Sequence, residues 1–200
     1  MRTIILLTAI AAASMAGNVE VHPGSIERDG DWLYYDNGSP EWLSWDGTYR
    51  GVWFNINDFV PGGGSGPVPQ CEFWFYHHSS YPWDTSDVSL ELWNGGVEGP
   101  QVLLAEDMVT ALHYSPVYAD FSPAVAEPEF WALANTELSA GGWPSILGDG
   151  AQGTVYHSFF SDDFIAWEPW DIDGACNYFV SAQMGESLAE TTWAGIKAVF

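Results

Sequence analysis

The chain has 200 residues, of which 47% are hydrophobic and 16% aromatic. This composition supplies enough apolar surface for a packed core and excludes a disordered chain. The length suits a single all-β domain. The 27 acidic residues face only four basic ones, so the net charge is −23. Such a charge repels nucleic acid phosphates and anionic membrane surfaces, which excludes both as expected partners and favours either a solvated acidic surface or cation binding.

The first sixteen residues are typical of a cleaved secretory signal peptide. Arg2 is followed by the apolar run Ile4–Ala13 and by small residues up to Ala16. An N-terminal core helix is the alternative interpretation. No later run approaches the roughly 20 apolar residues that a spanning helix needs, so no membrane insertion is expected. The sequence therefore predicts a secreted protein, extracellular or at the cell surface.

Short aromatic and β-branched runs follow, separated by turns rich in Gly, Pro, Asn and Asp. We expect strands at residues 32–35, 50–59, 70–78, 88–94, 101–105, 117–121, 130–135, 154–160 and 178–184. The run 70–78 places five apolar or aromatic residues among nine and carries one of the two cysteines, so it is interpreted as a central strand. No convincing helical period occurs before the C-terminus. The pattern predicts an all-β, two-sheet antiparallel sandwich over residues 17–188, with a tail or terminal element at 189–200.

Alternation within two of these runs points two tryptophans away from the core. Val52 and Phe54 take one face of their strand, which leaves Trp53 on the other, and the run 88–94 places Trp93 in the same way. Exposed aromatic rings beside carboxylates suit sugar rings, so we expect Trp53, Trp93, Glu91 and Trp74 to bind an extracellular carbohydrate. The alternative is that the Trp-rich segment 165–170 covers Trp53 and Trp93 as a second small core.

Cys71 and Cys176 each begin an aromatic-rich run. If these runs form neighbouring strands that start side by side, an oxidising compartment favours a disulfide between the two residues. Two free buried thiols are the alternative.

Five runs in order, Tyr34–Gly38, Gly51–Phe54, Cys71–Phe75, Val88–Trp93 and Phe130–Leu133, resemble a jelly-roll accessory domain of secreted multidomain bacterial proteins. The resemblance implies a β-sandwich in an extracellular setting and brings no catalytic residues. The segment 191–197 also looks like short C-terminal segments of such exported proteins. A plain terminal strand or helix is the alternative there.

Common catalytic and nucleotide-binding motifs are absent from the sequence, including Gly-x-Ser-x-Gly, His-Glu-x-x-His and a phosphate-binding loop. His77 and His78 are adjacent, so on a strand their rings point to opposite faces and cannot share a metal. Asp171 and Asp173, before Gly174, offer alternating carboxylates that suit calcium. Solvated turn residues are the alternative interpretation of this pair.

Glycoside hydrolysis is the enzymatic hypothesis that the residues allow. It needs two carboxylates across a cleft lined by aromatic rings. Glu72 and Glu91 would form that pair if their strands were neighbours. The main expectation is instead a non-catalytic extracellular module, structural or ligand-binding, whose partner is a carbohydrate or another surface protein.

Overall fold

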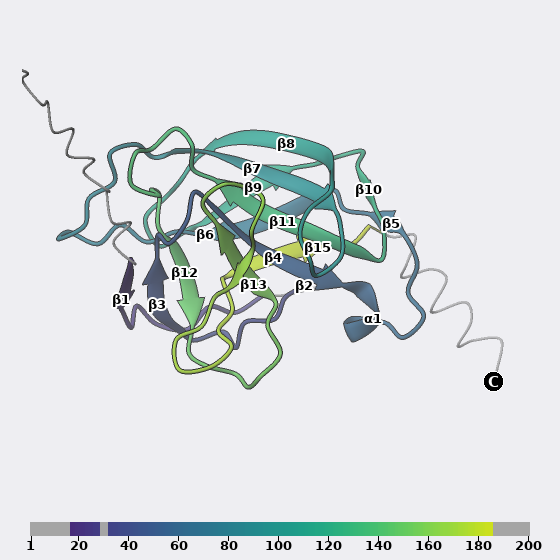
Figure 1. Ribbon diagram of the computed structural model, residues 1–200, viewed down its shortest axis with the longest axis horizontal. Helices are drawn as coiled ribbons and strands as arrows, with labels where there is room; N and C mark the ends of the chain where they lie inside the picture. The colour runs from purple at the N-terminus through teal and green to yellow at the C-terminus, as the bar shows by residue number, and fades with distance from the viewer. Residues whose placement is uncertain (1–16, 29–31, 186–200) are drawn as a thin grey trace, which may run out of the picture.

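The computed structural model describes residues 17–28 and 32–185 (Figure 1). The predicted signal peptide and the segment 189–200 lie outside these residues. The described chain forms β1 (Asn18–Glu20), β2 (Trp32–Leu33), β3 (Pro40–Ser44), β4 (Tyr49–Asn55), α1 (Ile56–Phe59), β5 (Gly66–Pro67), β6 (Gln70–Trp74), β7 (Asp87–Asn94), β8 (Val102–Thr110), β9 (Pro116–Asp120), β10 (Val125–Ala126), β11 (Glu129–Asn135), β12 (Ile146–Asp149), β13 (Ser158–Ser161), β14 (Glu168–Pro169) and β15 (Val180–Gln183). Within the described ranges no helix is long and apolar enough to cross a membrane.

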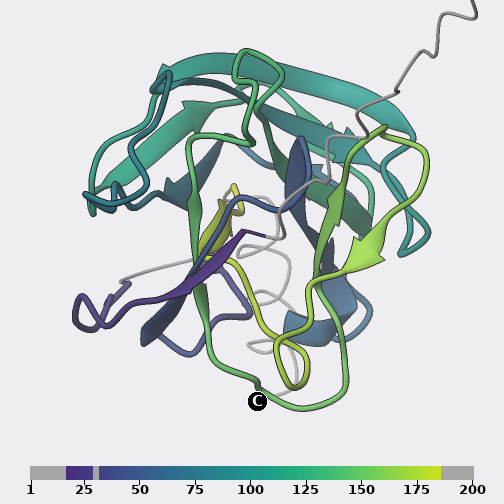
Figure 2. The same ribbon diagram turned by 60° about the vertical axis from the view of Figure 1, so that its left-hand side comes forward.

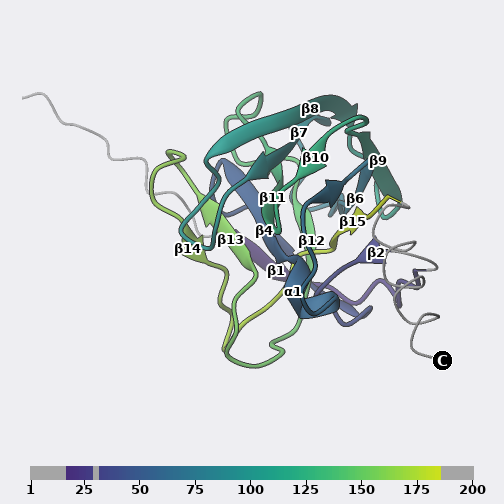
Figure 3. The same ribbon diagram turned by 90° about the vertical axis from the view of Figure 1, so that its right-hand side faces the viewer.

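Two antiparallel sheets face each other and confirm the predicted all-β sandwich. The larger has the order β14-β13-β4-β11-β7-β8, and the smaller has the order β2-β15-β6-β9. Figure 3 shows them on opposite sides of the molecule. Their inner faces meet in one core that contains Phe54 and Leu90 from the larger sheet and Phe73 and Val180 from the smaller. The strand predicted to be central, β6, lies inside its sheet between β15 and β9.

Alternation predicted the faces of β7 correctly, because Val88, Leu90 and Leu92 are all fully buried. The following strand is longer than expected. β8 extends to Thr110, forms the edge of the larger sheet and packs against β9, where the two sheets approach each other (Figure 2). The backbone N–H of Asp120 donates to Asp107 across this junction, at 3.0 Å.

The expectation of a strand through residue 59 is wrong. The chain leaves β4 at Asn55 and turns into the short helix α1. The Asn55 side chain accepts a hydrogen bond from the backbone N–H of Asn57, which is the interaction that begins a helix at an asparagine. Ile56 is buried in the helical turn, and a strand could bury the same apolar side chain, so this residue could not distinguish the two in the sequence.

A third sheet, of order β1-β3-β12, lies at the left of Figure 1. A bridge between Phe75 and Ile146 connects it to the chain just after β6. A second hydrophobic cluster lies beneath it, made of Val21, Ile26, Leu43, Leu147 and Phe179. None of the strands expected from the sequence falls on the residues of these three strands. These strands are only three to five residues long, near or below the lower limit of the roughly four to eight residues over which alternation can be recognised, so long-range pairing defines them.

The predicted disulfide is not formed, because Cys71 and Cys176 are both free and buried. The strands that follow them are neighbours, as expected, but β6 and β15 run antiparallel. Gln70 at the start of β6 therefore pairs with Gln183 at the end of β15, and Cys71 lies opposite Ala182. Antiparallel pairing places the two strand starts, and so the two cysteines, at opposite ends of the pair.

Candidate functional site

Trp53 and Trp93 lie on the outer face of the larger sheet, as alternation predicted. Trp131 of β11 pairs with both, so three tryptophans form a row across β4, β11 and β7. The loop between β13 and β14 covers part of this row. The ring centroid of Phe164 lies 4.9 Å from that of Trp93, and the centroid of Trp167 lies 5.0 Å from that of Trp131. Trp131 is fully buried, and Trp53 and Trp93 are half-buried.

The covering loop overlaps the segment 165–170 that the sequence suggested: Trp167 of that segment packs on Trp131, whereas Phe164, just before it, packs on Trp93. Ile165 is 83% exposed, whereas Trp170 belongs to the main core and stacks on Tyr178 at 4.5 Å. Trp53 stacks on the ring of His157, at 5.5 Å between centroids. Tryptophans on this face therefore already have partners within the chain.

Glu91 is held tightly on the same face. Its carboxylate accepts hydrogen bonds from Trp93 Nε1 at 2.7 Å and Asn135 Nδ2 at 2.8 Å. Burial raises the pKa of Glu91, and the two hydrogen bonds act in the opposite direction. These contacts make Glu91 part of the packing under the loop.

Glu72 lies far from Glu91 in the fold. It belongs to β6 in the smaller sheet, whereas Glu91 belongs to β7 in the larger one. Each side chain is on the face opposite its strand's core residues, so the sandwich core separates them. Glycoside hydrolysis requires the two carboxyl groups within about 10 Å across a shared cleft. These two residues therefore do not form the catalytic pair that the hydrolase hypothesis needs.

Asp171 and Asp173 lie in the turn after β14. Asp171 accepts hydrogen bonds from the Tyr156 hydroxyl at 2.6 Å and from the Gly174 backbone N–H at 2.8 Å, and both lower the pKa of Asp171. In the described part of the chain, no group of three or more His, Cys, Asp or Glu side chains is placed to hold a metal ion. The carboxylate of Asp171 thus acts as a turn acceptor, and the geometry adds nothing to the calcium hypothesis.

A different surface gathers aromatic side chains in contact with one another. Ring centroids 4.8 to 6.4 Å apart connect successive members of a series from Trp143 to Trp74, and a branch extends from Tyr76. We call this set the aromatic band: Trp143, Trp45, Tyr81, His78, Tyr76, Tyr114 and Trp74 in the series, with His113, His77 and Trp83 in the branch. None of the ten side chains is buried, and Tyr81, His77 and His113 are exposed.

The band forms where loops from several strands converge. Its members follow β3, end or follow β6, precede β9 and precede β12. One side of the band rests on the second hydrophobic cluster, which packs against Trp45, Trp74, Tyr76 and Tyr114. Trp83 packs against the main core, and the side chains of Tyr81, His77 and His113 are exposed to solvent.

Comparison with protein-family models, with curated proteins and with solved structures gave no match.

Hydrogen bonds fix the orientation of the rings in the band. Trp83 Nε1 donates to Ser145 Oγ at 3.0 Å, and that hydroxyl donates to the Tyr76 carbonyl at 2.6 Å. The backbone N–H of His77 donates to His113 Nδ1 at 3.0 Å. Side chains held in this way lose little conformational entropy when a ligand binds. The band is a preorganised aromatic surface.

Sequence analysis identified only Trp74 among the residues of this band as a ligand-binding side chain. Trp45 and Trp143 are 98 positions apart, yet their rings are 4.8 Å apart. Each ring taken alone sits in a loop with no periodic neighbours, so no local pattern marks it. The one available signal was the unusual number of tryptophans, 12 in 200 residues.

Proposed function

We propose that this protein is a secreted, non-catalytic β-sandwich module that binds a neutral extracellular polysaccharide through the aromatic band. The observation that carries the proposal is the set of ten connected, partly exposed rings. Large apolar groups left at a surface in a contiguous patch commonly form a binding site. The N-terminal leader pattern supports secretion, and the band gives the module a surface on which to act.

The shape and chemistry of the band favour sugar rings as its ligand. A sugar ring has apolar C–H faces that pack on flat aromatic groups, and its hydroxyls reach the polar tips of Tyr, Trp and His. Nucleic acid bases also stack on aromatic rings, but a net charge of −23 repels their phosphates. The same charge disfavours acidic polysaccharides. A neutral polymer therefore fits better than either.

The absence of catalysis in the proposal follows from the surroundings of the band. Glu72 is the carboxylate that contacts Trp74, and Asp84 lies beyond Trp83, where its oxygens accept hydrogen bonds from Ser139 and from the Ala140 backbone. Both carboxylates are therefore already occupied by hydrogen bonds within the chain. In the proposal, the band acts by stacking and by hydrogen bonds from its polar ring tips.

The proposal predicts that Tyr81→Ala weakens polysaccharide binding. Tyr81 is 39% exposed and its ring contacts only Trp45 and His78 within the band. Loss of one stacking platform should weaken binding about tenfold, equivalent to about 1.4 kcal/mol, with almost no change in melting temperature. Affinity electrophoresis in gels that contain cellulose derivative, xylan, mannan, starch or soluble chitin, compared with alginate, measures this.

Tyr156→Ala is the matched control, because Tyr156 is a half-exposed tyrosine outside the band and should leave binding unchanged. The proposal is wrong if the wild-type chain binds none of the neutral polymers. It is equally wrong if gels that contain polysaccharide slow the Tyr81→Ala and Tyr156→Ala variants to the same extent. Binding to alginate alone would contradict the charge argument.

A further inference from the structure

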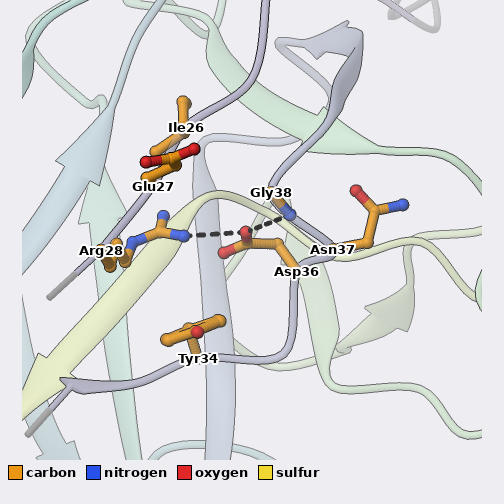
Figure 4. A pocket seen from close by; sticks show the side chains of 7 residues that line it. All are labelled: Ile26, Glu27, Arg28, Tyr34, Asp36, Asn37 and Gly38. Carbon is orange, nitrogen blue, oxygen red and sulfur yellow. Dashed lines mark hydrogen bonds and ion pairs between the residues drawn. The ribbon is translucent and has the colours of Figure 1, made fainter.

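A separate pocket adjoins the aromatic band at its Trp74 end. Figure 4 shows the residues that line it, in the segment 26–28 and the turn 34–38. The volume of the pocket is about 420 Å³. This volume lies in the range of small-molecule sites, about 300 to 1,000 Å³. Its polar groups centre on Arg28, which is one of only two arginines that follow the predicted leader.

Arg28 is buried and firmly positioned. Its side chain is 3% exposed, its Nε donates to Glu72 Oε1 and its Nη1 donates to Asp36 Oδ1, both at 2.8 Å. The guanidinium also lies over the ring of Tyr34, at 5.0 Å, and near that of Phe179, at 5.4 Å. Few rotamers satisfy all four contacts, so the cation is fixed at the pocket wall.

Two polar atoms at this wall have no hydrogen-bond partner in the described structure: Nη2 of Arg28 and Oδ2 of Asp36. Both have almost no exposed surface, so a ligand reaches them only when the atoms that cover them shift, and a partner gained there offsets the destabilisation of a buried polar group without one. One atom is a donor and the other an acceptor. A ligand that offers both an acceptor and a donor would satisfy them together.

The charges around the pocket restrict the ligand further. Glu27, Asp36 and Glu72 surround the single cation, so the site is negative overall and disfavours anions. A hydroxyl group both donates and accepts, and adjacent hydroxyls could serve Arg28 and Asp36 at once. The Tyr34 ring, 39% exposed, provides a flat face for apolar C–H groups.

We infer that this pocket is a subsite for one neutral sugar residue, recognised by Arg28 and Asp36 through its hydroxyls and by Tyr34 through its ring face. Glu72 connects it to the band, because Glu72 Oε1 accepts hydrogen bonds from both Arg28 Nε and Trp74 Nε1, each at 2.8 Å. The inference rests on the proposed function, in which this subsite holds a residue of the polysaccharide at the Trp74 end of the band.

The chain offers a direct spectroscopic test. Without the leader it contains two arginines, Arg28 and Arg50, so the ¹⁵N-correlated spectrum has two side-chain Nε–H signals. Arg50 is fully buried with its Nη groups on the carbonyls of Ser44 and Pro144, and serves as the internal control. The probes are the methyl glycosides of glucose, mannose, galactose, xylose and N-acetylglucosamine, with glucuronate as the anionic comparison.

The expected result is a saturable shift of the Arg28 signal with at least one neutral glycoside, while the Arg50 signal stays in place and glucuronate has no effect. Tyr34→Ala should weaken the response at least fivefold, and Tyr34→Phe should retain it. The Tyr34→Ala substitution also removes a ring that lies 5.0 Å from the Arg28 guanidinium. The Nε–H signal that this substitution shifts in the spectrum of the free protein is therefore that of Arg28.

Three results would overturn the inference: an Arg28 signal unmoved by all five neutral glycosides, equal responses in wild type and Tyr34→Ala, or a response to glucuronate alone. Failure here is distinct from failure of the proposed function. If Tyr81→Ala weakens polysaccharide binding while Arg28 never responds, the band binds without this subsite. If Arg28 responds and no polysaccharide binds, the pocket stands and the proposed function fails.

Discussion

At the scale of single residues, Asp149 is the acid whose protonation should most affect stability near neutral pH. The side chain is fully buried, with Oδ1 accepting from the Asn177 backbone N–H at 2.6 Å and Oδ2 from that of Asn37 at 3.1 Å. Burial raises the pKa of Asp149 from 3.8 to about 7, and the charge of Asp36 acts in the same direction. The two backbone donors oppose the shift without cancelling it.

A raised pKa in the folded state makes Asp149 destabilising as the pH increases. Its stabilising effect is complete below pH 3.8, where folded and unfolded chains are both protonated, and is lost as the pH rises through about 7. The whole shift corresponds to at most about 4 kcal/mol. We expect the melting temperature to fall between pH 5 and pH 8, and Asp149→Asn to flatten that slope at the cost of one hydrogen bond at every pH.

Asp171→Asn is the control for this pH series, since the pKa of Asp171 is lowered and this residue does not titrate between pH 5 and pH 8. Thermal melts at constant ionic strength provide the measurement. An identical slope in wild type and Asp149→Asn would show that the buried carboxyl does not control the pH dependence.

At the scale of elements, the loop between β13 and β14 acts as a cover for the larger sheet. It places Phe164 against Trp93, and Phe164 also makes an edge contact with Tyr49 at 4.8 Å. Trp93 in turn donates to the buried Glu91. Removing the indole would open a void under the loop and leave a buried carboxylate with one partner fewer.

We expect Trp93→Ala to lower the free energy of unfolding by about 3 kcal/mol and to leave polysaccharide binding unchanged, because the ring belongs to packing under the loop. Ile165→Ala, an 83% exposed position in the same loop, should change stability by less than about 0.5 kcal/mol. Denaturant unfolding and affinity electrophoresis measure the two properties. Loss of binding with unchanged stability would instead place the ligand on this face.

At the scale of the whole molecule, charge repulsion is the dominant electrostatic feature. Among the described residues, the ion pairs are two from Arg28 and one between His22 and Glu20. Most of the 27 acidic side chains therefore repel one another, and this repulsion weakens as salt shortens its range from about 30 Å at 0.01 M to about 3 Å at 1 M.

The melting temperature should rise steadily when sodium chloride increases from 10 mM to 1 M, because screening favours the compact chain more than the expanded one. Differential scanning calorimetry gives the measurement. A flat profile would contradict the repulsion argument. A larger effect of calcium than of magnesium at equal concentration would instead indicate a specific cation site, for which Asp171 and Asp173 are the sequence-based candidates.

Local sequence patterns were sufficient for the all-β class and for the faces of the longer strands. Val88, Leu90 and Leu92 alternate over a whole strand, so period two alone assigns them to the core and Trp93 to the other face. The fold class and the strand faces both depend on patterns among residues that are close together in the sequence. The same reasoning failed at Ile56, where one buried residue fits a strand and a helical turn equally well.

Only the tertiary structure decided which distant residues meet. Antiparallel pairing of β6 with β15 separates Cys71 from Cys176, and assignment of β6 and β7 to different sheets separates Glu72 from Glu91. It also brings Trp45 to Trp143 and Arg28 to Glu72, contacts that join segments with no shared local pattern. Strand order and direction depend on the packing of the whole core, so a site built from several loops becomes visible only once that packing is known.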